Sequence, residues 1–258
     1  LLLDLKPSET EFTAEDETLC SFAESETEKL NKKLGDAFFI AIRKKKFNKE
    51  TKKYAGEERK RGAVSDFISA IYANDFSEFS LISGDIFGAE YITLLDSDTV
   101  PSPDSVARLI GVLEHPVTAP VIDCTGSVVE SGYGIAVPSL GVLLSDANKT
   151  RFTAIKSENA GSEPYSDSVF SIGNDLFGEG IFCGKGVVRI KEFYELVAKA
   201  FPKGKILSHD IPEGNILRTA YISDAVFYDD IPDDIVSFTE RGCRWIRGDI
   251  QNTLFLKK

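Results

Sequence analysis

YITLLDSDTV, residues 91–100, joins a short apolar run to two closely spaced acids. Residues 91–95 are apolar or β-branched, which favours a strand buried on both faces of a mostly parallel sheet. Asp96 and Asp98 follow at once, with one serine between them. Because open α/β sheets bind ligands beyond the carboxyl ends of their strands, two carboxylates here could reach one hard cation such as Mg²⁺ or Mn²⁺. The alternative is a solvated strand-to-helix turn, where Asp and Ser are common.

The composition is that of an ordinary soluble protein. The 258 residues suffice for one large α/β domain, and the net charge of −11 argues against a general nucleic-acid binder. No apolar run approaches the roughly 20 residues that span a bilayer, and no signal-peptide pattern is present. Four cysteines without a CxxC pair are typical of reduced cytoplasmic thiols rather than of a zinc site. The sequence contains no methionine, so we expect a fragment of a longer protein.

Strand and helix patterns alternate along the chain. They predict helices at 15–34, 63–73, 103–114, 190–201 and 233–247, and strands at 1–5, 37–42, 79–83, 91–95, 118–123, 205–207 and 220–228. This alternation indicates a three-layer α/β domain. Residues 145–169 are rich in Ser, Asn, Glu and Lys, and we interpret them as a lid or peripheral insertion.

A basic stretch lies between residues 43 and 61, with ten Lys or Arg against three Glu. We interpret its first part, 43–53, as the solvated surface of a hairpin. Its end differs, because Lys60 and Gly62 directly precede a predicted helix. A glycine that opens a helix beside cations favours an anion site, formed by free N–H groups and the helix dipole.

Two later stretches also carry unusual residues. Four glycines fall within residues 178–186, which indicates tight backbone packing against a ligand or a neighbouring strand. A Ser-His-Asp turn at 208–210 follows a short predicted strand. Residues 241–245 combine two arginines with the only tryptophan of the chain.

Together these motifs resemble a known family. The matching strings are GEERKRG (56–62), YITLLDSDT (91–99), DLFGEGIFCGKG (175–186), ILSHDIPEG (206–214) and RGCRWIRGDIQ (241–251). Their order resembles the GT-A catalytic domain of processive, inverting glycosyltransferases of the cellulose synthase type. The longer strings are most similar to the glucosyltransferase domain of cyclic β-1,2-glucan synthases, and the resemblance runs from about residue 1 to residue 251.

The resemblance implies a fold and an activity. The fold would be a three-layer GT-A domain over 1–258 with a mostly parallel central sheet, lacking its first strand and its flanking membrane segments. The activity would be inverting, metal-dependent transfer of glucose from UDP-glucose onto a growing β-1,2-glucan, with Mg²⁺ or Mn²⁺ as cofactor. The full-length protein would work at the cytoplasmic face of the plasma membrane.

The resemblance also assigns roles on the donor side. Asp4 would contact the uracil or ribose of the sugar nucleotide, and Lys60 and Gly62 would approach its diphosphate. Asp96 and Asp98 would hold the metal ion beside that diphosphate.

On the acceptor side, Asp210 matches the catalytic base that takes the proton of the attacking hydroxyl. Phe182, Cys183 and Gly184 match the strand that flanks the acceptor. The remaining matches are to the Gln-x-x-Arg-Trp motif: Arg241 stands in the Gln position, Arg244 would meet the diphosphate, and Trp245 would be the acceptor platform.

Each assignment has a simpler alternative. Asp210 could be the N-cap of a short helix, Trp245 a core residue, and Cys183 a small packing residue. For the whole chain, the alternatives are a sugar-nucleotide nucleotidyltransferase, which would produce pyrophosphate, and a nucleotide-sugar-binding fragment without turnover.

Overall fold

A computed structural model describes residues 1–49, 51–84, 86, 88–157, 172–198, 200–201 and 209–253. The chain forms two compact units, Leu1–Ala89 and Glu90–Lys258. The α/β class predicted from the sequence is confirmed, since helices and strands alternate through both units. The predicted strand at 205–207 and residues 158–169 of the predicted lid lie outside the described residues.

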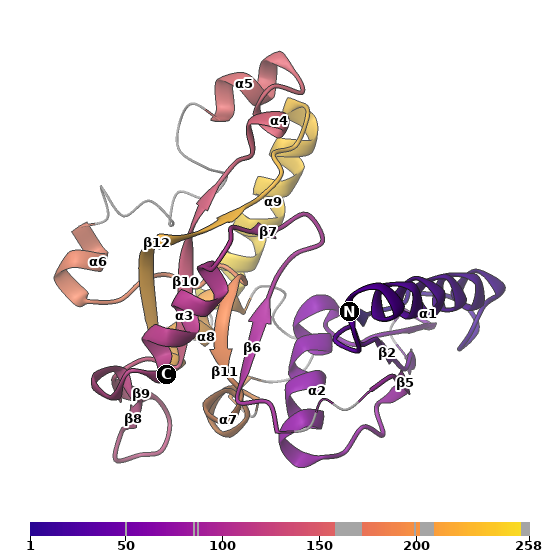
Figure 1. Cartoon of the computed structure of the whole chain (residues 1–258), viewed down its shortest axis with the longest axis horizontal. Coiled ribbons are helices and arrows are strands. Elements are labelled where there is room, and N and C mark those ends of the chain that lie inside the picture. The colour runs from indigo at the N-terminus through magenta and orange to yellow at the C-terminus, as the bar shows by residue number, and fades with distance from the viewer. Residues whose placement is uncertain are drawn as a thin grey trace. The chain divides into compact units, whose positions relative to one another are not determined.

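The first unit is a three-stranded sheet between two helices (Figure 1). Strand β1 (Leu2–Leu3) is parallel to β2 (Ala41–Arg43), which is antiparallel to β5 (Phe79–Ile82). Helices α1 (Ala14–Leu34) and α2 (Arg59–Ala73) cover opposite faces of β2. Ile40 and Ile42 pack with Cys20 of α1, whereas Ala41 packs with Ala70 of α2. This follows from the two-residue period of a strand, which turns neighbouring side chains to opposite faces.

Local sequence sets the start of α1. Thr13 accepts a hydrogen bond from the Asp16 backbone N–H, and the Asp16 carboxylate accepts one from the Thr13 N–H, which together form a capping box. The predicted helix at 15–34 is confirmed.

The basic hairpin of this unit is partly buried. Strands β3 (Lys46–Asn48) and β4 (Lys53–Ala55) pair as predicted. The interpretation of 43–53 as solvated surface is wrong for Arg43 and Lys45, each only 5% exposed. Both are buried because they neutralise buried or half-buried carboxylates: Lys45 lies 2.6 Å from Asp16, and Arg43 binds Asp66.

The second unit contains a curled, mixed sheet in the order β6-β11-β10-β12-β7. Its strands are β6 (Tyr91–Leu94), β7 (Val100–Pro101), β10 (Ile135–Gly141), β11 (Gly186–Arg189) and β12 (Thr219–Tyr228), and a separate hairpin comprises β8 (Val121–Ile122) and β9 (Val129–Ser131). The helices are α3 (Ser105–Glu114), α4 (Leu144–Ala147), α5 (Arg151–Ser157), α6 (Ile172–Phe177), α7 (Ile190–Glu192), α8 (Asp210–Leu217) and α9 (Ile235–Asn252), with a 3₁₀ turn η1 (Pro116–Thr118) and a π-helical turn η2 (Phe193–Val197).

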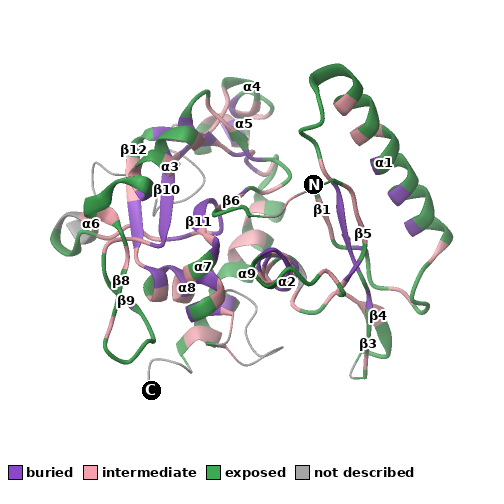
Figure 2. Ribbon diagram, turned by 60° about the horizontal axis from the view of Figure 1, so that its bottom comes forward, coloured by how far each residue is buried: buried purple, intermediate pink, exposed green. Residues whose placement is uncertain are grey.

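Helix α3 packs across β10, β11 and β12 and closes the core of this unit (Figure 1). Leu109 and Leu113 of α3 are fully buried against Val187 and Phe227. Strand β10 is buried along most of its length, as Figure 2 shows. This core fixes the ends of β11 and β12, where the polar residues of the site begin.

Two sheet predictions are not supported by the described strands. The central sheet is not mostly parallel: only β10 and β12 run parallel, and the other three pairings are antiparallel. Strand β6 pairs only with β11 in this sheet, and only Leu94 of its four residues is buried. An apolar run shows that a strand is covered, but it carries no information about strand direction or the number of neighbours.

Several element boundaries also differ from prediction. Helix α2 begins at Arg59 rather than after Gly62, and the helix predicted at 190–201 is a short α7 that continues into η2. The strand predicted at 118–123 is divided between η1 and β8. Among the described helices, none combines the length and apolar character needed to cross a bilayer.

Candidate functional site

The Asp-Ser-Asp stretch forms a tight turn attached to the end of β12. The Asp96 N–H donates to the Thr99 hydroxyl oxygen at 3.2 Å, and the Thr99 N–H donates to the Asp96 carbonyl at 3.1 Å. The Thr99 hydroxyl in turn donates to Asp229 Oδ1 at 2.7 Å. Strand β7 follows the turn and pairs with the end of β12, which brings Thr99 and Asp229 together.

A buried lysine joins this turn to β11. The Lys185 ammonium lies 2.7 Å from Asp229 Oδ2 and 3.2 Å from Asp96 Oδ2. The side chains of Lys185 and Asp229 are 8% and 4% exposed, whereas that of Asp96 is 37% exposed. Asp98 is exposed on the same turn. The cluster therefore has a buried side, formed by Lys185 and Asp229, and an open side with the two predicted metal ligands.

Asp210 lies against the backbone next to Lys185. Gly184 has φ +80°, and a Cβ placed on it would be 2.9 Å from Asp210 Oδ2. This contact and the left-handed backbone both favour glycine at position 184. The predicted catalytic base and the predicted metal turn are thus joined through two consecutive residues, although they are far apart in sequence.

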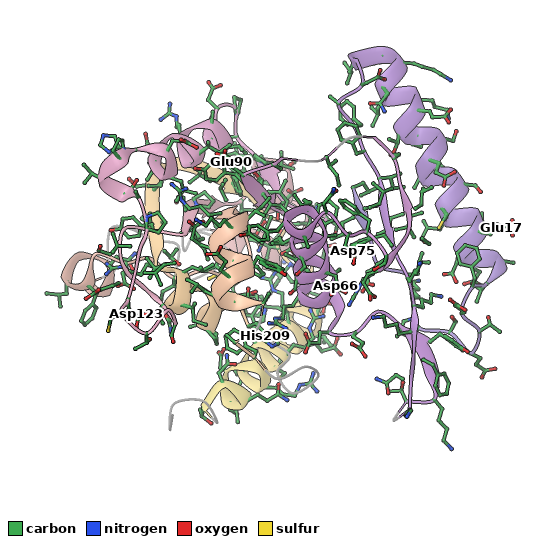
Figure 3. The ribbon with its side chains drawn as sticks, turned by 90° about the horizontal axis from the view of Figure 1, so that it is seen from below. Glu17, Asp66, Asp75, Glu90, Asp123 and His209 are labelled. Carbon is green, nitrogen blue, oxygen red and sulfur yellow. The ribbon has the colours of Figure 1, made fainter. Side chains whose placement is uncertain are left out.

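The N-cap alternative for Asp210 is wrong. Asp210 is the first residue of α8, and the capping position is held by His209, whose side chain makes no capping hydrogen bond. His209, labelled in Figure 3, is buried instead. Its ring lies edge-on to that of Phe201, with 5.5 Å between the ring centres.

The stretch 182–184 supports α8. Phe182 is 1% exposed, and a Cβ on Gly214 of α8 would be 2.8 Å from the Phe182 Cβ. The Phe182 side chain therefore packs in the core beneath α8 in this structure. Cys183 is half-buried and lines a small hollow together with Lys185 and Tyr221. Acceptor contact by Phe182, Cys183 and Gly184 stays a prediction.

The arginine–tryptophan motif lies on α9. Asp234 caps this helix by accepting hydrogen bonds from the Val236 and Ser237 N–H groups. The Arg241 guanidinium lies 4.9 Å from the centre of the Trp245 ring. Trp245 is 39% exposed, so the alternative that it is a core residue is wrong. Its predicted convergence with Asp210, and the diphosphate contact of Arg244, stay predictions.

In the first unit, Asp4 belongs to a cluster centred on Arg43. The Arg43 guanidinium binds Asp66 of α2 at 2.7 Å (Figure 3), donates to the Glu57 carbonyl at 2.8 Å and lies 3.5 Å from Asp4. Burial raises the pKa of the Asp4 carboxyl above its ordinary value, although the nearby Arg43 opposes the rise. A Cβ on Gly62 would be 2.9 Å from the same guanidinium, so Asp4 and Gly62 both lie beside the buried Arg43 side chain.

The prediction that Gly62 opens a helix with free N–H groups is wrong. Gly62 lies inside the first turn of α2, and its N–H donates to the Glu58 carbonyl at 3.3 Å. Glycine is needed there for another reason, because a Cβ would be 2.0 Å from the Glu57 carbonyl oxygen. Lys60 is exposed on the same turn.

Sequence reasoning missed four residues of these clusters: Arg43, Thr99, Lys185 and Asp229. Asp229 follows the apolar end of β12 just as Asp96 follows β6, so the rule that singled out Asp96 would have found it. Arg43 likewise ends an apolar run. Thr99 and Lys185 carry no comparable signal.

The carboxylates of Asp96 and Asp98 suit a hard cation that also binds water or substrate oxygens. Among the described residues, no group of three or more His, Cys, Asp or Glu side chains is arranged to hold a metal ion. Asp96 and Asp98 offer carboxylate oxygens on the open side of the cluster. Mg²⁺ and Mn²⁺ commonly bind through one or two carboxylates and complete their shell with water and substrate phosphates, so the residues present fit such an ion.

Comparison with curated proteins relates the chain to glucan synthases. It is 30% identical over 97% of its length to the cyclic beta-(1,2)-glucan synthase NdvB of Rhizobium meliloti. The predicted resemblance to cyclic β-1,2-glucan synthases is confirmed. The chain is also 25% identical, over 77% of its length, to the glucans biosynthesis glucosyltransferase H of Bradyrhizobium diazoefficiens. It spans 9% of the first relative and 24% of the second, and no family model matches it.

Proposed function

We propose that this chain is the catalytic domain of an inverting, metal-dependent glucosyltransferase that moves glucose from UDP-glucose onto a growing β-1,2-glucan. Both relatives carry names of glucan-forming proteins, which supports glycosyl transfer. The finer proposals rest on the motif resemblance. They include a three-layer GT-A fold and action at the inner face of the plasma membrane through segments outside this chain.

One observation carries the proposal. Asp210 lies against Gly184, and the next residue, Lys185, forms an ion pair with Asp96. A glycosyl transfer needs a base for the acceptor and a cation site for the leaving group within one sugar's length of each other. The link from Asp210 through Gly184 and Lys185 to Asp96 supports such an arrangement, although the two carboxylates come from distant parts of the sequence.

The chain's own residues would divide the chemistry as follows. The acceptor hydroxyl oxygen attacks the anomeric carbon, its proton passes to the Asp210 carboxylate, and the bond to UDP breaks with its electron pair leaving on the diphosphate. A single in-line displacement of this kind inverts the anomeric configuration. Trp245 would stack on the acceptor sugar, because its partly exposed ring offers an apolar face.

Charge on the leaving diphosphate needs compensation. Asp96 and Asp98 would hold Mg²⁺ or Mn²⁺, which when bound neutralises developing negative charge. Arg244 and Lys60 are the proposed fixed cations for the phosphate oxygens, since guanidinium and ammonium groups donate several hydrogen bonds to them. Asp4 would bind the uridine.

Two substitutions test these roles. With UDP-glucose and Mn²⁺, we expect Asp210→Asn to lower the rate of UDP release by about 10²–10⁴-fold, the usual contribution of a general base. We expect Asp98→Ala to weaken binding of Mn²⁺ and UDP together. Asp224→Asn is the matched control, because this carboxylate is 68% exposed and pairs with Arg108 of α3.

The products separate the candidate functions. Release of UDP together with a β-linked glucan supports the proposal, and release of pyrophosphate would support a nucleotidyltransferase instead. Unchanged turnover in both Asp98→Ala and Asp210→Asn would refute the assigned roles.

A further inference from the structure

Asp229 is a buried carboxylate to which no sequence pattern assigned a role. It directly follows β12, its side chain is 4% exposed, and both of its oxygens are engaged. Oδ1 accepts a hydrogen bond from Thr99, and Oδ2 pairs with Lys185 at 2.7 Å. Both of these partners also contact Asp96: Thr99 through the Asp96 backbone N–H and Lys185 through the Asp96 carboxylate.

The distances show how the Lys185 charge is shared. The ammonium lies closer to Asp229, at 2.7 Å, than to Asp96, at 3.2 Å. Lys185 is buried, so a carboxylate must compensate its charge. Without Asp229, the Lys185 ammonium would be drawn toward Asp96, whose oxygens would then be less available to a second cation.

We propose that Asp229 is a positioning residue for the cation–diphosphate site: by holding Lys185 and Thr99, it fixes the Asp-Ser-Asp turn and leaves Asp96 able to bind a divalent ion. This inference rests on the proposed function, because it assumes a metal ion on Asp96 and Asp98. It adds a residue from a third strand to that site.

Asp229→Asn should have three effects, and all three change the metal affinity in the same direction. The substitution removes a negative charge near the incoming cation, transfers the Lys185 ammonium to Asp96, and weakens the hydrogen bond that fixes Thr99. Each of them lowers metal affinity. A purely structural role for Asp229 would lower the unfolding temperature but leave the metal affinity of the folded protein unchanged.

The neighbouring residue supplies a matched control. Asp230 also pairs with a lysine, Lys149, at 2.8 Å, but its side chain is 37% exposed. Asp230→Asn therefore makes the same chemical change one residue away, outside the cluster.

The experiment measures Mn²⁺ binding by electron paramagnetic resonance, with and without UDP, beside thermal unfolding of each variant. We expect Asp229→Asn to weaken Mn²⁺ binding about 10–100-fold, the usual cost of losing a residue that orients a metal ligand. Asp230→Asn should change it by less than about twofold, because an exposed ion pair contributes little.

A Lys185→Met background tests the route. If Asp229 acts by holding Lys185, then Asp229→Asn should cost less metal affinity in Lys185→Met than in the parent chain. An equal cost in both backgrounds would contradict the proposed route. Thr99→Val, which keeps the shape and charge of the side chain, is the substitute test if Asp229→Asn does not fold. Thr99→Val should also weaken Mn²⁺ binding, and unchanged Mn²⁺ binding would overturn the inference.

Mn²⁺ binding by the parent chain separates a failure of the proposed function from a failure of the role of Asp229. If the parent chain binds no Mn²⁺ in the presence of UDP, the proposed function fails and this inference fails with it. If the parent binds Mn²⁺ and folded Asp229→Asn binds it equally well, only the role of Asp229 is refuted.

Discussion

Replacement of Gly184 by alanine should uncouple sugar transfer from nucleotide binding. Gly184 has φ +80°, and a Cβ there would lie 2.9 Å from Asp210 Oδ2, whereas ordinary contacts begin at 3.4 Å. Either the Asp210 carboxylate or the backbone at 184 must therefore move by several tenths of an ångström. Asp96 has no such contact with the new methyl group, so the metal turn should keep its place.

Two magnitudes follow from this geometry. An L-residue in the left-handed region costs about 1–2 kcal/mol, which lowers the unfolding temperature by about 2–8 °C in a unit of this size. Misplacing a catalytic group by up to 1 Å can cost about 10²-fold in rate, so we expect a loss of about ten- to a hundredfold in transfer.

Gly126→Ala is the matched control for the strain alone. Gly126 has φ +71°, but a Cβ there would meet nothing within 4 Å. Transfer from radiolabelled UDP-glucose, UDP–Mn²⁺ titration and thermal unfolding should be measured for both variants. We expect similar losses of stability and unchanged UDP–Mn²⁺ binding, with a lower transfer rate only in Gly184→Ala. Equal transfer rates in the two variants would refute the placement of Asp210 as the base.

Two further predictions concern the buried ion pairs of the first unit. Burial alone would raise the pKa of Asp16, but hydrogen bonds from Lys45 and Thr13 outweigh it and hold that pKa below its ordinary 3.8. The Lys45–Asp16 ion pair therefore stabilises the fold above pH 3.8, and this stabilisation is lost as the pH falls through the lowered pKa. Lys45→Met should lower the free energy of unfolding by about 3–5 kcal/mol at neutral pH, measured by urea denaturation. The difference in unfolding free energy between Lys45→Met and the parent should become smaller in acid. A difference that does not depend on pH would contradict this explanation. Arg43→Met should lower the free energy of unfolding by about 3 kcal/mol, because it leaves Asp66 without its cation. Lys44→Met, at an exposed neighbouring position, should lower it by less than about 1 kcal/mol. Equal losses in the two variants would show that the Arg43 cluster is not structural.

The sequence predicted well the features that depend on local pattern. Helix α1 begins and ends within a residue of its expected bounds, because its cap, acidic first turn and terminal glycine are all local signals. The amphipathic helix α3 and the hairpin of β3 and β4 follow from periodicity and turn residues in the same way. The motif series was also sufficient to identify the relationship to glucan synthases.

Features that depend on which segments meet could not be predicted. The pattern of 91–95 predicted a strand but not that it pairs only with β11 in its sheet, and the glycine at 62 predicted a special backbone but not its place inside α2. Arg43 looked like one more surface cation, because the carboxylates that bury it come from other elements.

By itself, the sequence determined the α/β class, the four longest of the described helices and the candidate carboxylates, because each of these is encoded within a few neighbouring residues. Only the tertiary structure decided that Asp210 touches Gly184 and that Lys185 and Asp229 hold the Asp-Ser-Asp turn. The physical reason is that a buried charge requires a partner, and a chain supplies that partner from whichever strand end the packing brings beside it.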